Sequence, residues 1–200
     1  MPYYVSLMHQ QDIARVAEID REAFPTMVLP ADYQRELHSP LAHYVVAYDG
    51  ERELAGGRLS GDKTAVPERD IVGFAGFWVM AGEAQIVNIA VRQSCRRRGI
   101  GELLLIALID LAMEIDAHLL TLEVRASNTA AQSLYHKYGF ALKGLRRGYY
   151  SDDKEDAVIM IAENIASAPF QRRLNQLKQV HSRRWGVTSI SDCPSITLIV

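Results

Sequence analysis

Three consecutive arginines and two nearby glycines form the segment of the sequence with the clearest chemical meaning. They lie between the apolar run 84–91 and a leucine-rich run that begins at 102. The glycines permit a sharp turn, and the first N–H groups of a helix have no partner inside that helix. The helix dipole and the guanidinium groups would attract an anion. A diphosphate site and a solvated basic turn both fit this pattern, whose residues are Arg96, Arg97, Arg98, Gly99, Ile100 and Gly101.

Glu123 is the candidate base of the sequence. It lies in the run 119–125, LLTLEVR, where alternation places Leu122 and Val124 on one face and Glu123 with Arg125 on the other. Apolar surroundings strengthen a carboxylate as a base, whereas the charge of Arg125 has the opposite effect. A structural ion pair between Glu123 and Arg125 is therefore the alternative interpretation.

Tyr135 is the candidate acid. It follows Leu134 in the helical run 128–138 and shares a face of that helix with Ala131 and Tyr138. A tyrosine at this spacing is commonly a core residue, and its hydroxyl still needs a polar partner when it is buried. The pattern therefore leaves both a core role and a proton-donating role open.

The elements that must position these residues follow from periodicity and turn signals. Strands are expected over 3–7, 42–50, 70–82, 83–91, 119–125, 140–150 and 155–162. Helices are expected over 11–24, from Pro30 to Leu37, over about four turns from Gly101, and over 128–138 before Gly139.

A strand, a helix and a second strand at residues 83–125 imply a parallel pair, because a helical crossover joins parallel neighbours. The short turn before Glu83 predicts an antiparallel hairpin instead. The expected fold class is α/β, with a mixed and mostly antiparallel sheet of about seven strands, a central parallel pair and about four flanking helices.

The domain prediction is one domain over 1–163 followed by a basic extension over 164–200. Polar and glycine-rich residues 50–69 are longer than a usual connection and predict a flexible hairpin insertion. From residue 165 onward, five basic residues and one acidic residue give a net charge of +4, which leaves −6 for the rest because the whole chain carries −2.

Composition narrows the function classes. A net charge of −2 gives no general attraction to nucleic acid or to an anionic membrane, and we expect no membrane span. Two cysteines form neither a disulfide framework nor a metal-ligand pair, which favours a cytoplasmic protein. The six histidines make no helical or cysteine-paired cluster, so we expect no metal.

Several spaced motifs together resemble the GNAT superfamily of acetyl-CoA-dependent N-acetyltransferases. They are NIAV at 88–91 followed by RRRGIG, then LEVRASN, SLYHKYGF and GYY with EDAVIM. Within the superfamily, the chain is most similar to the bacterial ribosomal-protein-alanine N-acetyltransferases. The likeness is dense over 83–162 and thinner over 3–50, and motifs in a fixed order are a stronger signal than one glycine loop.

The resemblance implies acetyl-CoA as cosubstrate and assigns roles by motif. The pattern [Q/R]-x-x-G-x-[G/A] matches Arg96, Gly99 and Gly101, so the backbone of Arg96–Gly101 would hold the pyrophosphate. Glu123 would be the base and Tyr135 the acid. Residues expected beside the pantetheine arm or near the cofactor are Ile89, Ala90, Val91 and Asn128.

Acceptor recognition is the least determined part of the sequence. By analogy with the family, Tyr149, Tyr150, the loop 151–156 and the segment 24–30 are expected to line the acceptor site, although loop aromatics also serve as lids over a core. Glu83 is a second candidate base acting through water. The expected acceptor is a protein N-terminus, and lysine side chains or small amines are the alternative acceptors.

A nucleic-acid-binding module is the competing class of function. Arg96–Arg98 and the basic extension would be its contacts, yet neither basic run is interleaved with aromatic residues. Contact between the extension and ribosomal RNA is compatible with the enzyme interpretation.

Overall fold

The computed structural model describes residues 3–26, 31–50 and 70–186. One seven-stranded sheet runs in the order β1-β2-β3-β4-β5-β7-β6. Only β4 and β5 are parallel, which confirms the predicted mixed sheet with a central parallel pair. The strands are β1 (Tyr3–Leu7), β2 (Ala42–Asp49), β3 (Ile71–Met80), β4 (Glu83–Val91), β5 (Leu119–Arg125), β6 (Ala141–Arg146) and β7 (Ala157–Glu163).

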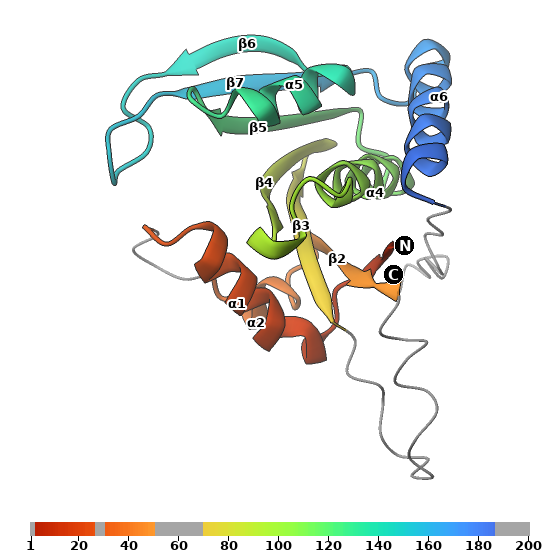
Figure 1. Ribbon diagram of the computed structural model, residues 1–200. Coiled ribbons are helices and arrows are strands. Elements are labelled where there is room, and N and C mark those ends of the chain that lie inside the picture. Colours follow the sequence, from red (N-terminus) through yellow and green to blue (C-terminus); the bar gives the residue numbers. More distant parts are fainter. Residues whose placement is uncertain (1–2, 27–30, 51–69, 187–200) are drawn as a thin grey trace, which may run out of the picture.

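Helices cover both faces of this sheet (Figure 1). The smaller core lies under α1 and α2, and the larger core lies under α4, with α5 and α6 packed at its edge. The α-helices are α1 (Ile13–Ala23), α2 (Tyr33–Glu36), α4 (Ile100–Glu114), α5 (Thr129–Lys137) and α6 (Ala168–Trp185). Two 3₁₀ turns, Gln10–Asp12 and Gln93–Cys95, precede α1 and α4.

Two predicted boundaries differ from the structure for a local reason. The second helix begins at Tyr33, because the Asp32 side chain accepts a hydrogen bond from the Arg35 N–H and caps it there. The strand predicted over 140–150 ends at Arg146, since Gly148 has a φ of 58° and turns the chain. Of the predicted insertion over 50–69, residues 51–69 lie outside the described part.

Helix α4 is buried on nearly all sides. Ten of its fifteen residues are buried, whereas helical periodicity in the sequence indicates only one apolar face. The sheet covers one side of α4, and α6 contributes Leu174 and Leu177 to the same core from another. A helix between two layers needs no polar stripe, which explains the leucine-rich sequence.

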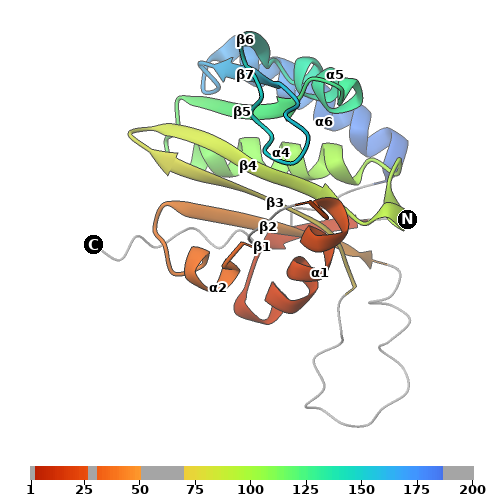
Figure 2. The ribbon, with the colours of Figure 1, turned by 90° about the vertical axis from the view of Figure 1, so that its left-hand side faces the viewer.

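The C-terminal extension contains an element that periodicity alone did not assign. Residues 168–185 form α6, whose second residue is Pro169 and whose Leu174 is buried. Figure 2 shows α6 lying beside α4, with its last turn near the first turn of α4. In the described residues, no helix is long and apolar enough to cross a membrane.

Candidate functional site

The sheet opens between β4 and β5. These strands pair only from Glu83 with Leu119 to Ile86 with Leu122. Beyond Ile86, β4 stays paired with β3, while β5 stays paired with β7. The two strands therefore diverge, and the edge of β4 from Val87 to Val91 faces an opening in the sheet.

A β-bulge contributes to this divergence. The register between β3 and β4 passes from Gly76–Asn88 to Phe77–Ile86, so Val87 is an extra residue on β4. A bulge bends its strand and increases the local twist. The predicted pantetheine residues Ile89, Ala90 and Val91 all lie on the diverging part of β4.

The turn at the end of β4 has the conformation of an anion-binding loop. Arg97 and Gly99 both have left-handed backbone conformations, with φ of 64° and 80°. Turns of this kind can present successive N–H groups to an anion. Gly99 stands at the N-cap of α4 and has no side-chain oxygen, so it leaves the first N–H groups of the helix for another acceptor.

The three arginines of this turn are exposed and differ in their contacts. Arg96 donates from Nε to the Val91 carbonyl at 3.2 Å, and Arg98 is hydrogen-bonded to Tyr3, which raises the pKa of that guanidinium. Positive charge is thus concentrated around the backbone donors of the loop. We refer to residues 96–101 as the phosphate loop.

Glu123 lies where β5 leaves β4. Its side chain is only 10% exposed and receives a hydrogen bond from Gln85 Nε2 at 3.0 Å. Its other oxygen is 3.3 Å from Arg146 Nη1. The partner named in the alternative interpretation is wrong, because Arg125 binds carboxylates from another loop; Glu123 forms its ion pair with Arg146.

Tyr135 packs against the larger core from α5, and its ring lies 5.8 Å from that of Phe140. Burial, with a smaller effect of Tyr150, raises the pKa of Tyr135 to about 12. Tyr150 also interacts electrostatically with Glu123. Tyr150, a residue predicted to line the acceptor site, thus lies near both the predicted base and the predicted acid.

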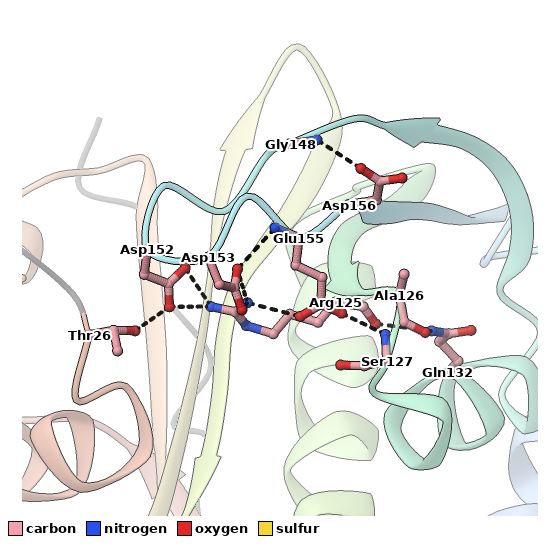
Figure 3. Close-up of polar contacts among 10 residues, drawn as sticks. All are labelled: Thr26, Arg125, Ala126, Ser127, Gln132, Gly148, Asp152, Asp153, Glu155 and Asp156. Carbon is pink, nitrogen blue, oxygen red and sulfur yellow. Dashed lines mark hydrogen bonds and ion pairs between the residues drawn. The ribbon is translucent and has the colours of Figure 1, made fainter.

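Arg125 is the centre of a charge cluster that sequence analysis missed (Figure 3). Its guanidinium lies 2.7 Å from Asp152, 2.8 Å from Asp153 and 2.9 Å from Glu155. It also stacks on Tyr150, with Cζ 3.9 Å from the ring centroid. We call Arg125 and these three carboxylates the Arg125 cluster; it fastens the β6–β7 loop to the end of β5.

The cluster also reaches the segment after α1. Thr26 Oγ1 donates to Asp152 Oδ2 at 2.6 Å, which joins two segments predicted to line the acceptor site. The Thr26 hydroxyl, followed by Arg125, lowers the pKa of Asp152. Glu155 accepts from the Ser127 N–H, which, together with Arg125, lowers the pKa of Glu155.

The remaining predicted residues lie at three separate places in the structure. Tyr149 and Tyr150 sit edge to face at 5.2 Å, and Tyr149 is exposed. Asn128 is exposed and caps α5 by accepting from the Ala131 N–H. Glu83 pairs with Leu119, about 13 Å along the strand from Glu123 at about 3.3 Å per residue.

A metal centre has no candidate in the part of the chain that the structure covers. No group of three or more histidine, cysteine, aspartate or glutamate side chains there is placed to hold an ion. The Arg125 cluster contains three carboxylates, but a guanidinium occupies its centre.

Comparison with known proteins supplies the family. The model of the acetyltransferase (GNAT) family matches residues 13–140, and the chain belongs to this family. It is an N-acetyltransferase.

Individual relatives share much of the sequence. A Bacillus subtilis (strain 168) protein with the provisional name [ribosomal protein bS18]-alanine N-acetyltransferase is 36% identical over 76% of this chain and 90% of its own length. The N-alpha-acetyltransferase RimI of Mycobacterium tuberculosis is 34% identical over 80% of this chain and 91% of its own.

A solved structure agrees with these relatives. The crystal structure of the ribosomal-protein-S18-alanine N-acetyltransferase from Escherichia coli matches with a TM-score of 0.63 and 28% identity. The match covers 81% of this chain and 94% of the other.

Proposed function

We propose that this enzyme transfers the acetyl group of acetyl-CoA to the N-terminal amine of a protein, and that the acceptor is a ribosomal protein with an N-terminal alanine. The observation that carries the proposal is the position of Glu123 directly after the last β5 residue that pairs with β4, with Tyr150 near both Glu123 and Tyr135. The names of the B. subtilis and E. coli relatives support the choice of acceptor.

The chain has a suitable set of groups for acetyl-CoA. The edge of β4 at Ile89, Ala90 and Val91 lies past the last residue paired with β5, so it can pair with the amides of a linear arm, as an added strand would. The phosphate loop would hold the diphosphate through its backbone N–H groups. Asn128, at the start of α5 and exposed, would approach the cofactor from the other side.

Two side chains would move the protons of the reaction. An N-terminal ammonium has a pKa of about 7.7 to 8.0, and only the neutral amine attacks, so Glu123 accepts its proton. The amine nitrogen then bonds to the thioester carbon, and a backbone N–H of β4 stabilises the oxyanion. As the carbon–sulfur bond breaks, Tyr135 donates its proton to the thiolate, and the second proton leaves the amide nitrogen and returns the Tyr135 phenolate to its protonated form.

The acceptor side is suited to a cation. Asp152 and Asp153 lie in the β6–β7 loop beside Tyr149 and Tyr150. Their charge is only partly offset by Arg125, which also faces Glu155. An acceptor that arrives as an ammonium would be attracted to this loop before Glu123 deprotonates it.

A peptide panel tests the proposal. The purified enzyme is incubated with acetyl-CoA and peptides that begin with alanine, with other residues, or with an already acetylated alanine before an internal lysine, alongside a polyamine. Mass spectrometry should find one acetyl group on the first residue of the free alanine peptide. Modification of small amines alone would overturn the protein-acceptor part of the proposal.

The proposal places the enzyme in the cytoplasm, where its acceptor is made. Contact between the extension and ribosomal RNA remains a prediction. Arg183 and Arg184, both exposed in the last turn of α6, are the residues on which to test it, by ribosome co-sedimentation of a variant with both changed to alanine. Residues 187–200 lie outside the described part of the chain.

A further inference from the structure

The last turn of α6 meets the phosphate loop from about 82 residues away in the chain. Along the way, Lys178 pairs with Asp110 of α4 at 2.6 Å, and Gln171 contacts Met113. The family model ends at residue 140, so α6 lies outside the part of the chain that defines the family. Its contact with the loop is therefore a feature that the family match does not explain.

His181 makes the polar part of this contact. Its Nε2 lies 3.0 Å from the Gly99 carbonyl, the same oxygen that accepts the Leu103 N–H in the first turn of α4. A carbonyl can only accept, so the His181 tautomer must carry its proton on Nε2. The hydrogen bond holds the peptide group that joins the loop to the helix.

The other ring nitrogen of His181, Nδ1, indicates that the hydrogen bond from Nε2 to Gly99 is the important interaction of this side chain. The side chain is 3% exposed, and Nδ1 is buried with no hydrogen-bond partner among the described residues. An unsatisfied buried nitrogen is costly, and an apolar side chain would avoid that cost. An apolar side chain at position 181 would, however, lose the hydrogen bond to the Gly99 carbonyl.

Trp185 makes the apolar part of the contact. A Cβ added at Gly99 would lie 2.6 Å from the indole Nε1, so the ring occupies the space beside the glycine. The Arg184 guanidinium lies 5.0 Å from the Trp185 ring centroid. The indole is thus held against the residue that carries the left-handed turn of the loop.

We propose that His181 and Trp185 are positioning residues that hold the phosphate loop in its diphosphate-binding conformation. The inference rests on the proposed role of the loop in binding acetyl-CoA. If only a fraction of the molecules have the loop in its binding conformation before the ligand arrives, the apparent affinity is the intrinsic affinity multiplied by that fraction. The contacts of His181 and Trp185 with Gly99 would keep that fraction high.

The test compares two thioesters on the full chain. Acetyl-CoA carries the diphosphate and S-acetylpantetheine does not, so a loop defect should affect only the first. His181→Ala should raise the KM for acetyl-CoA and the Kd for CoA about three- to tenfold, the value of one net hydrogen bond, with kcat within about twofold. The kcat/KM for S-acetylpantetheine should stay unchanged.

Two variants sharpen this result. His181→Gln restores an N–H donor near the Nε2 position and should recover most of the CoA affinity. Gln176→Ala changes an exposed residue of the same helix and should match the wild type. If His181→Ala fails to fold, Trp185→Phe serves instead, with circular dichroism as the check, and it should also weaken CoA binding.

Three outcomes would overturn the inference. Folded His181→Ala and Trp185→Ala that bind CoA like the wild type would show that α6 has no influence on the loop. Tighter binding by Trp185→Ala would show that the indole obstructs the site. Equal loss with both thioesters would indicate general damage. If the wild type itself releases no heat with CoA, the proposed function is wrong, and this inference is wrong with it.

Discussion

The two sides of the opening in the sheet are built by different physical means. On the cofactor side, the phosphate loop takes its shape from left-handed backbone conformations at Arg97 and Gly99 and from packing against α6. On the acceptor side, the β6–β7 loop is held by the ion pairs of the Arg125 cluster. The first arrangement leaves its donors to the ligand, whereas the second already uses most of its charges within the protein.

This difference predicts different sensitivities. Backbone conformation and packing are sensitive to substitutions that change side-chain volume or disfavour the local φ, and they are scarcely sensitive to pH or salt. Exposed ion pairs are screened by salt and are lost on protonation. Changes on the cofactor side should therefore alter the KM for acetyl-CoA, while changes on the acceptor side should alter the KM for the peptide.

The largest effect is expected where the two sides meet. Glu123→Gln and Tyr135→Phe should each lower kcat by about 10²- to 10⁴-fold, because each removes one proton transfer, and calorimetry should show nearly unchanged CoA binding. Glu83→Gln makes the same chemical change at the closed end of β4 and tests the second candidate base; a much smaller loss than for Glu123→Gln is expected there. Wild-type rates in both site variants would remove the assignments.

Gly99→Ala should have the next largest effect. A side chain at φ 80° is strained by about 1–3 kcal/mol, and its Cβ would collide with Trp185. Thermal unfolding and CoA calorimetry should show lower stability and a Kd raised about tenfold.

Gly101→Ala is the control for this change. Its Cβ would meet only Val91 at 3.8 Å, and the residue is helical, so the variant should bind CoA normally. Equal losses at 99 and 101 would contradict the idea that the conformation of Gly99 matters.

Arg125→Met should have a smaller effect on catalysis. It leaves Asp152, Asp153 and Glu155 facing one another and frees Tyr150, so the peptide KM should rise about three- to tenfold while the KM for acetyl-CoA stays constant. Lys143→Ala breaks an exposed ion pair with Glu163 on the neighbouring strands and should change neither value. A rise in the KM for acetyl-CoA would show that the two sides are not independent.

The smallest effect is the pH dependence of stability. The pKa values of Asp152 and Glu155 are lowered in the folded chain, so their stabilising contribution is complete above their unfolded values of about 3.9 and 4.3. It is lost as pH falls through the lower folded values. The difference in Tm between the wild type and Arg125→Met should therefore shrink from pH 6 to pH 3, and a constant difference would argue against the cluster.

The cofactor side could be predicted from the sequence because its determinants are local. Gly99 and Gly101 lie within six residues of Arg96, and the strand and helix around them have clear periodicities. The alternation over 119–125 also placed Glu123 and Arg125 on one face, as the burial pattern of β5 shows. Local signals of this kind suffice for the order of the elements and for the turn between β4 and α4.

The partners of these residues could not be predicted in the same way. Arg125 meets Asp152 from 27 residues away, and Glu123 meets Gln85 and Arg146 across neighbouring strands. The sequence of α6 is polar and basic, and nothing in it indicates that Leu174 and His181 are buried. Contacts between distant segments depend on the assembled fold, so the periodicity of a local stretch of sequence does not predict them.

The four-residue ladder between β4 and β5 has a mechanical consequence. From β4 the chain passes through α4, β5, α5, β6 and β7 into α6, and the contact of Trp185 with Gly99 brings it back beside the end of β4. This path is a closed loop whose two ends are joined by the contacts of His181 and Trp185 with Gly99. Because the ladder between β4 and β5 is only four residue pairs long, this closure would restrict the movement of the two strands relative to each other. Helix α6 would thereby influence the gap in which we propose that the thioester lies, without a contact of its own to the thioester.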